Sequence, residues 1–434
     1  MSGAPVGLTL PHLSEPDPEL AGEGALDPLG LFSVADRLAE EIAPGITARM
    51  FRVRFLTAMA VSAAINEGLG DIVPADSGST PELAFEWLLV EALVRRLESS
   101  PSATLRVPGS DKARSVVSRD GHLGSSAYLK TPKVFGFHGV YKRLAIALGI
   151  VDANLSLLER GNSLLRTWET EQGLDGFVDR RPDTNGGSLA LRLEEATCAA
   201  ARAGRVQESP KVAMWSDLAR VLRPDAAGAQ EKRLLWDWLV DETEPVRREL
   251  VGGIQRLEEI EDEASALRAL RQGASADLGL RLDAIDSYER FSELIQGSFD
   301  WLRYYSTQRG TSPLVAATLP SEGLPGEVLR LLPQVTDTVA RRLAPLGLEM
   351  QFEGAFGRLR TAASVADLAQ LLFERHDQVQ RAKPPHGKRS WFDSATEGVV
   401  VRLPYRLPEA PALTGAYLHP YRVFAIWSFL EDLK

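Results

Sequence analysis

Helical periodicity covers almost all of residues 189–309, and this pattern constrains the fold more than any other sequence feature. Apolar residues recur there at the spacing of amphipathic helices. In the longest run, 244–270, apolar residues such as Leu250, Ile254 and Leu257 follow one another by four or three positions. This spacing is close to a heptad stripe, which is typical of a coiled coil or of one long bundle helix. We expect a single bundle helix, with an exposed coiled-coil helix as the alternative.

The remaining segments predict further helices and few strands. Helical spacing is present over 31–42, 49–64, 82–97, 112–118, 135–148 and 163–169, and again over 327–344, 365–380 and 421–433. Only 348–352 and 398–402 have the alternating, β-rich pattern of short strands. The predicted fold is therefore mainly α: a helical multi-domain protein with a small mixed α/β C-terminal region.

Changes in composition divide the chain into five predicted parts. Residues 1–28 are rich in Gly, Pro and acidic residues and are expected to form a flexible arm, and 173–188 has the Gly and Pro density of a linker. The other parts are a helical block over 29–172, an acidic helical bundle over 189–310 and the mixed region over 311–434. The first thirty residues lack the pattern of a signal peptide, and no segment approaches a membrane span.

The distribution of charge is uneven. The chain has 49 basic and 59 acidic residues, a net charge of −10. Between Arg106 and Arg166, however, ten basic residues face four acidic ones, whereas residues 241–300 have a net charge of −8. A basic stretch in an acidic chain is typical of a site for a polyanion such as DNA. The candidate DNA-binding residues in this stretch are Lys112, Arg114, Arg119, Lys130, Lys133, His138, Lys142 and Arg143.

The same stretch has a recognisable order of elements. A predicted helix over 135–148 is followed by Gly149, a short predicted hairpin over 150–158 and another helix after Gly161. The pattern is carried by Tyr141, Leu144, Leu148, Gly149, Ile150, Val151, Leu155, Leu157, Leu158, Gly161, Leu164 and Leu165. This order resembles the last third of a winged helix-turn-helix module, over about 109–170. The resemblance implies that helix 135–148 enters a DNA major groove with a wing beside it, whereas His138 within it is either a groove-facing donor or a packed ring.

A second basic stretch follows the helix predicted over 365–380. Between Arg375 and Arg406, seven basic residues face three acidic ones. Cations bind phosphate oxygens and an exposed indole stacks on bases, which makes this loop a second candidate site. Its candidate residues are Arg381, Lys383, Lys388, Arg389 and Trp391. The alternative is a solvated basic turn that Trp391 and Phe392 anchor to the core.

Motifs for catalysis are scarce. The sequence has no P-loop, no His-Glu-x-x-His, no Gly-x-Ser-x-Gly and only one cysteine, Cys198, which indicates a reducing, cytoplasmic environment. Asp225, followed by Gln230, Glu231 and Lys232, superficially resembles the pattern of metal-dependent nucleases. Gln230 stands where the second carboxylate should be and both flanks have helical patterns, so a helix-loop-helix is expected. We predict no catalytic residue, metal ligand or cofactor.

Together these features favour a non-catalytic, DNA-associated subunit of a bacterial multi-protein complex, either a DNA-transaction machine or an anti-phage defence complex. The Ala, Arg, Gly and Leu bias is typical of a GC-rich bacterial source. DNA and other protein subunits are the expected partners, and no association with a membrane is expected. One alternative is a scaffold without DNA contact, similar to the kleisin-like partners of chromosome-organising ATPases. Another is a metal-dependent nuclease whose carboxylates come from distant positions.

Overall fold

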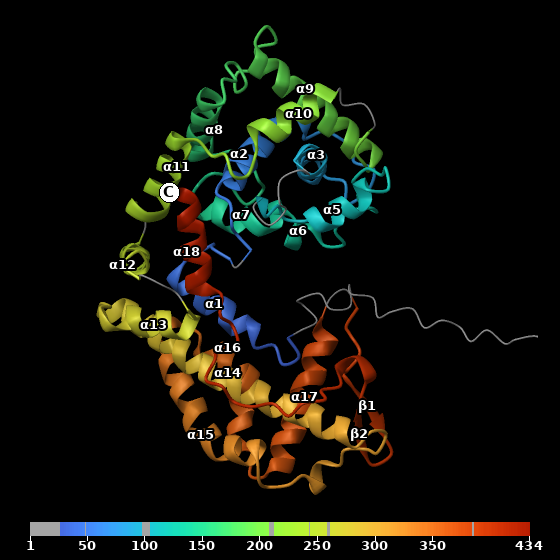
Figure 1. Ribbon diagram of the computed structural model, residues 1–434, viewed down its shortest axis with the longest axis vertical. Coiled ribbons are helices and arrows are strands. Elements are labelled where there is room, and N and C mark those ends of the chain that lie inside the picture. The colour runs from blue at the N-terminus through green and yellow to red at the C-terminus, as the bar shows by residue number, and fades with distance from the viewer. Residues whose placement is uncertain are drawn as a thin grey trace, which may run out of the picture. The chain divides into compact units, whose positions relative to one another are not determined.

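The structure, a computed structural model, describes residues 27–47, 49–97, 105–207, 212–242, 244–257, 261–383 and 386–434 (Figure 1). These residues form two compact units. Unit 1 contains 27–37 and 283–419, and unit 2 contains 38–282 and 420–434. The division falls within α1 (Phe32–Ile42) and α14 (Ala276–Gln308), so each unit is discontinuous in sequence.

These units differ from the parts expected from composition. Residues 173–188, expected as a linker, lie within unit 2, where turns lead directly into the helix that begins at Asn185. The predicted arm lies outside the described residues up to residue 26. Asp27 and Pro28 are held against a helix of unit 1 through bonds from Lys383 and His376. Composition identifies loops, but it does not show which loops are packed.

Over its described residues, the regular elements of unit 2 are all helices apart from isolated bridges. Its elements are α2 (Arg54–Asn66), η3 (Glu67–Leu69), α3 (Pro81–Arg96), α5 (Ser110–Val117), α6 (Pro132–Phe135), α7 (Phe137–Ala147), α8 (Glu159–Glu171), α9 (Asn185–Ala203), α10 (Val212–Val221), α11 (Ala229–Trp236), η4 (Asp237–Asp241), α12 (Pro245–Ile254), α13 (Glu263–Gln272) and α18 (Arg422–Leu433).

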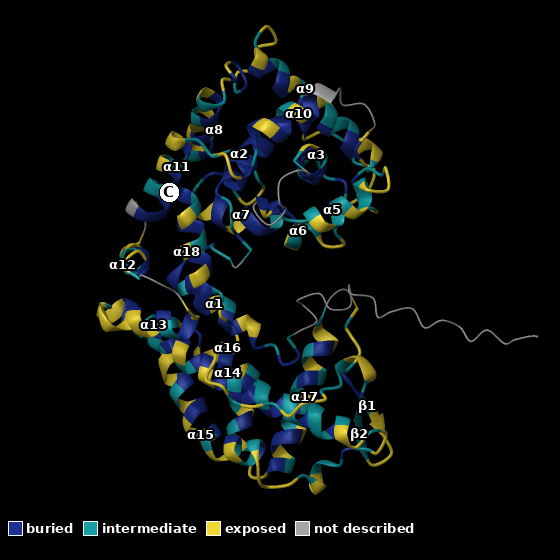
Figure 2. Ribbon diagram, in the orientation of Figure 1, coloured by how far each residue is buried: buried dark blue, intermediate teal, exposed yellow. Residues whose placement is uncertain are grey.

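Helix α2 forms the centre of unit 2. It contacts α3, α7, α8 and α9, and Figure 2 shows it almost wholly in the colour of buried residues. Small side chains at Ala58, Ala60 and Ala63 allow the surrounding helices to approach closely. Arg54 is also buried there and pairs with Glu231 at 3.1 Å, so its charge is compensated.

The C-terminal helix α18 docks on α11, α12 and α13, as its apolar sequence requires. Glu263 at the start of α13 accepts hydrogen bonds from the backbone N–H groups of Arg422 and Val423, at 3.0 and 2.9 Å. A carboxylate at a helix N-terminus satisfies free N–H groups and opposes the helix dipole. Burial nevertheless raises the pKa of Glu263. Phe424 and Trp427 remain on the outer side of α18, 45% and 36% exposed.

The single helix expected over 244–270 is wrong, because the segment forms the two separate helices α12 and α13. Gly252 and Gly253 weaken the end of α12, and Asp262 starts a new helix by accepting a hydrogen bond from the N–H of Ser265 at 2.8 Å. Leu250 and Ile254 of α12 and Leu267 of α13 are buried. The periodic apolar residues therefore serve two short packed helices; residues 258–260 lie outside the described part.

Unit 1 consists of helices packed along α14, together with a small hairpin. Tyr288, Phe291 and Phe299 on α14 form the aromatic core with rings from the other helices. The elements are η5 (Ala316–Thr318), α15 (Leu324–Leu343), η6 (Ala344–Leu346), α16 (Glu349–Phe356), η7 (Gly357–Thr361), α17 (Val365–Ala382), β1 (Phe392–Ala395), β2 (Gly398–Val401) and η8 (Leu403–Tyr405).

The two expected strands have different outcomes. The strand predicted at 398–402 is confirmed as β2, which pairs antiparallel with β1 in the register Phe392↔Val401. The strand predicted at 348–352 is wrong, because α16 occupies this segment and buries Phe352 and Phe356 on one side. Their spacing of four is helical, and the apolar run was too short to distinguish the two structures. The described part of the chain is thus mainly helical, with one two-stranded sheet.

Candidate nucleic-acid interface

A buried carboxylate on α3 joins segments that carry predicted DNA-binding residues of unit 2. Glu86 accepts hydrogen bonds from the hydroxyl of Tyr128 (3.0 Å) and from the backbone N–H of His138 (3.1 Å). Its Oε2 also lies 2.9 Å from Nδ1 of His138. These bonds replace the hydration that the carboxylate loses on burial. Glu86 therefore fixes the segment 128–138, including α6, against α3.

Helices α6 and α7 approach each other at Gly139. A Cβ atom there would lie 2.4 Å from the backbone carbonyl carbon of Lys133, so a larger residue could not be accommodated. Gly139, Lys142 and Arg143 are three and four positions apart and share one face of α7. Lys142 and Arg143 therefore lie on the same face of α7 as Gly139, which approaches the backbone of Lys133.

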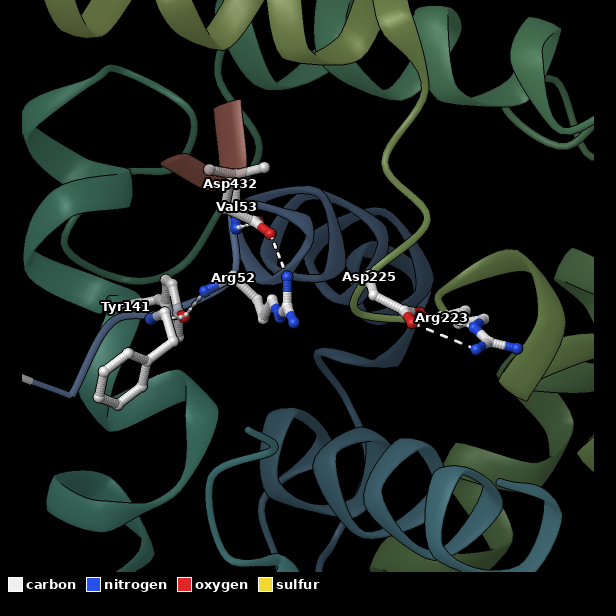
Figure 3. Close-up of polar contacts among 7 residues, drawn as sticks. Arg52, Val53, Tyr141, Arg223, Asp225 and Asp432 are labelled. Atoms are coloured by element: carbon white, nitrogen blue, oxygen red, sulfur yellow. Dashed lines mark hydrogen bonds and ion pairs between the residues drawn. The ribbon is translucent and has the colours of Figure 1, made fainter. Parts of the chain in front are cut away.

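The segment 45–53 runs along the same helix. The hydroxyl oxygen of Tyr141 accepts hydrogen bonds from the N–H groups of Phe51 and Arg52, each at 3.1 Å (Figure 3). At Gly45, a Cβ atom would lie only 2.8 Å from the Cα of Leu144. Burial raises the pKa of the Tyr141 hydroxyl, so its proton stays in place. This tyrosine is a structural anchor.

Asp432 near the end of α18 fixes the other end of this segment. Its carboxylate accepts a hydrogen bond from the N–H of Val53 at 2.8 Å and pairs with Arg52 (Figure 3). Val53 precedes the first residue of α2, so Asp432 compensates the free N–H groups at that helix start. The pairing also means that Arg52 is already neutralised within unit 2.

Two further arginines stack on aromatic rings in this region. The guanidinium carbon of Arg49 lies 4.5 Å from the ring centroid of Phe135, and that of Arg106 lies 4.3 Å from the ring centroid of Phe51. Ring faces attract cations and hold a guanidinium in a fixed plane. Arg49 was not among the residues predicted from the sequence, because it is distant in sequence from Phe135 and stands in no motif.

We call one set of cations the α6–α7 basic face: Arg49, Lys130, Lys133, Lys142 and Arg143. Lys130, Lys133 and Arg143 are exposed, and Arg49 and Lys142 are half-buried. Arg143 also forms an ion pair with Glu40 at 3.2 Å. Four of these five residues were predicted from the sequence.

Three other predicted residues lie on α5 or directly after it. Lys112 and Arg114 are half-buried, and Arg119 is exposed. Arg114 pairs with Asp111 at 2.8 Å, which reduces its charge available to a ligand. Helix α5 packs on α3, so these cations belong to unit 2.

His138, predicted as a possible groove-facing donor, is a packed ring. It is 4% exposed, and its Nε2 lies 2.9 Å from the hydroxyl oxygen of Ser62. Ser62, His138 and Glu86 thus have the order of a serine–histidine–acid triad, but all three side chains are buried inside the helices. We assign this chain of hydrogen bonds a structural role, and His138 is unavailable to a ligand.

Trp391, predicted to stack on bases, is also buried. It is 5% exposed, and its ring lies parallel to that of Tyr405 at 4.5 Å. Arg303 covers the indole at 5.0 Å, and Phe299 lies 5.9 Å from it. The alternative expectation, a basic turn that Trp391 and Phe392 anchor to the core, describes Trp391 correctly.

The cations near Trp391 belong to unit 1. Lys383 is half-buried and donates from Nζ to the carbonyl of Asp27 at 2.9 Å, and burial lowers its pKa. Arg381 lies 3.6 Å from Asp377, and Arg389 pairs with Asp393 at 2.6 Å. Lys388 is exposed. This loop therefore has fewer available cations than its sequence indicates; Pro384 and Pro385 lie outside the described residues.

The elements after α7 follow the expected order. Gly149, at a φ of 70°, leads to a single antiparallel bridge between Val151 and Leu157, and α8 follows. The resemblance implies a two-stranded wing at this place, whereas the structure has this single bridge. At its tip, Asp152 accepts hydrogen bonds from the N–H groups of Asn154 and Ser156, each at 2.8 Å.

The residues that resemble a nuclease site are occupied by other partners. Asp225 pairs with Arg223 at 2.6 Å, a bond that lowers the pKa of the carboxyl group (Figure 3). Glu231 is buried against Arg54 and Thr57, and burial raises its pKa. Among the described residues, no group of three or more His, Cys, Asp or Glu side chains is arranged to hold a metal ion.

A groove of about 690 Å³ follows α17 in unit 1. Its lining includes Phe373, Glu374, Asp377 and Arg381 of α17 and Val399 of β2. Glu374 pairs with Arg358 at 3.2 Å, and Asp377 with Arg381. The groove therefore has little uncompensated charge with which to select a ligand.

Comparisons with protein-family models, with curated proteins and with solved structures found no match for this chain. Within the described residues, no helix combines the length and the apolar character needed to cross a membrane. A functional assignment must therefore rest on the chemistry of the surfaces described above.

Proposed function

We propose that this protein is a non-catalytic subunit that binds DNA through the α6–α7 basic face. One observation carries the proposal: cations of three segments lie on or next to α6 and α7, in a chain whose net charge is −10. Local positive charge on an acidic protein attracts a polyanion to one surface and repels it from the others. The winged helix-turn-helix resemblance of 109–170 and the order of elements from α7 to α8 support the same ligand.

The proposal places this subunit in the cytoplasm, within a bacterial multi-protein complex that handles DNA or defends against phage. Two features support protein partners: the acidic composition of residues 241–300, and the exposed pair Phe424 and Trp427 on α18, whose rings lie 5.6 Å apart. Exposed aromatic residues are typical of protein interfaces. Purification of the chain from its native host, followed by identification of co-purifying proteins, tests this part.

The two alternatives gain no support. A scaffold of the kleisin-partner type needs a long exposed helix over 244–270 for pairing, and this segment forms two short, partly buried helices. A nuclease whose carboxylates come from distant positions would bring them together at one metal site, and the described residues contain no group of three or more His, Cys, Asp or Glu side chains arranged to hold a metal ion.

The direct test is the double variant Lys133→Glu and Lys142→Glu, measured by fluorescence anisotropy with a labelled duplex. Each lost phosphate contact makes the negative slope of log K against log salt shallower by about 0.9. The double variant should therefore have a slope that is shallower by about 1.8 and a lower affinity. The matched control is Arg220→Glu with Arg233→Glu, two exposed cations of α10 and α11. Equal effects of the two double variants, or no effect of either, would contradict the proposed site.

A further inference from the structure

The structure also bears on which part of DNA this face contacts. Resting on the proposed function, we infer that the α6–α7 basic face binds the sugar–phosphate backbone of duplex DNA without reading base sequence. Phosphate contacts give affinity, whereas discrimination among sequences needs side chains that reach base edges in a groove. Recognition of base sequence would therefore require side chains of unit 2 that extend from its surface into a groove.

The N-terminal turn of α7 cannot place side chains in a DNA groove. Recognition helices contact base edges with their N-terminal residues. In α7 these residues are Phe137 and His138, both buried, and the N–H of His138 is already bonded to Glu86. Gly139 has no side chain and lies against Lys133. Base contacts from this end of the helix would require the fold to open.

The exposed part of α7 is its C-terminal half. Its exposed residues are Arg143, Ile146 and Ala147. Ile146 and Ala147 have no hydrogen-bonding side chain, and Arg143 is paired with Glu40. The helix dipole is negative at this end, so deep insertion beside phosphates is unfavourable. Helix α7 consequently carries cations on its surface but lacks the exposed polar residues of a recognition helix.

The neighbouring segments also lack the amide side chains that read adenine. Between Arg106 and Ala147 the sequence contains no asparagine and no glutamine, the residues that bind adenine edges in pairs of hydrogen bonds. Lys133 and Lys142, by contrast, are flexible point charges suited to phosphate oxygens. The tip of the bridge after α7 carries Asp152, whose charge opposes entry into a minor groove.

The experiment uses the full chain and three labelled duplexes of equal length: one AT-rich, one GC-rich and one of mixed sequence. We expect dissociation constants that agree within about threefold, because one base-specific contact alone is worth about 1–3 kcal/mol, or roughly fivefold to 150-fold. Selection from a random duplex library should return no enriched motif.

The possible outcomes separate this inference from the proposed function. Binding with a preference of more than about threefold, or an enriched motif, overturns the inference and leaves DNA binding intact. Absence of binding to every duplex overturns the proposed function itself. Equal binding that Lys133→Glu with Lys142→Glu weakens on all three duplexes by the same factor supports both, whereas unequal weakening contradicts backbone recognition.

Discussion

His376 of α17 should remain uncharged in the folded protein and make unit 1 sensitive to acid. The ring is fully buried, and its Nε2 accepts a hydrogen bond from the N–H of Trp391 at 2.9 Å. Its Nδ1 lies 2.9 Å from the carbonyl of Pro28, so Nδ1 carries the proton and donates it. A second proton on Nε2 would break the bond to Trp391. The imidazole thus links the start of the described chain to the hairpin.

Burial lowers the pKa of His376 to about 4 from its ordinary value of 6.5. The unfolded chain therefore takes up a proton on this residue as pH falls below about 6.5, whereas the folded protein does so only near pH 4. The contribution of His376 to stability is complete above pH 6.5 and is lost as pH falls towards 4. The loss is about 2 kcal/mol at pH 5 and about 3 kcal/mol when complete.

The assay compares urea unfolding of the wild type and of His376→Gln at pH 7.5 and pH 5. The variant loses packing at both pH values, but the drop in unfolding free energy between them should be smaller by about 2 kcal/mol. Other titrating groups, such as Glu263, are common to both proteins and cancel. An NMR titration that gives His376 a pKa near 6.5 would refute the reasoning, as would equal pH dependence of the two proteins.

Three other substitutions test the packing account by thermal or urea unfolding. Glu86→Ala leaves the hydroxyl of Tyr128 and the N–H of His138 without their acceptor and should cost at least about 2 kcal/mol; a cost below half of this would mean that water replaces the carboxylate. Gly186→Ala should destabilise unit 2, because the new Cβ would lie 1.7 Å from the carbonyl oxygen of Leu174, whereas Gly354→Ala in the open interior of α16 should stabilise by about 0.5–1 kcal/mol; the same sign for both would contradict the geometry. Asp262→Ala should cost about 1 kcal/mol through loss of the α13 cap, and a neutral result would remove the cap from the explanation of why 244–270 is broken.

Local patterns predicted most of the helices, including α2 and α18. They failed in segments whose sequence fits two kinds of secondary structure equally well, because tertiary contacts decide between them. Residues 348–352 pack Phe352 as a helix, although the short run also fits a strand. The break within 244–270 depends on a cap at Asp262 that a heptad pattern does not reveal.

The candidate site was predictable in part. Counting charges located Lys130, Lys133, Lys142 and Arg143, because a local excess of cations is a property of the sequence itself. It could not show that Arg49 joins them through Phe135. Equally, burial of His138 and Trp391 depends on partners far away along the chain, such as Glu86 for His138, so their residue types alone indicated ligand contacts that the fold prevents.

The salt dependence of duplex binding by the intact chain tests the central claim most directly. If the α6–α7 basic face holds DNA, log K should fall linearly with log salt, with a slope no steeper than about −4.5 for its five cations and near −2.7 if three of them contact phosphates. The Lys133→Glu and Lys142→Glu variant should have a slope shallower by about 1.8. Salt-independent binding, or a slope that the double variant leaves unchanged, would show that this face does not bind the DNA backbone.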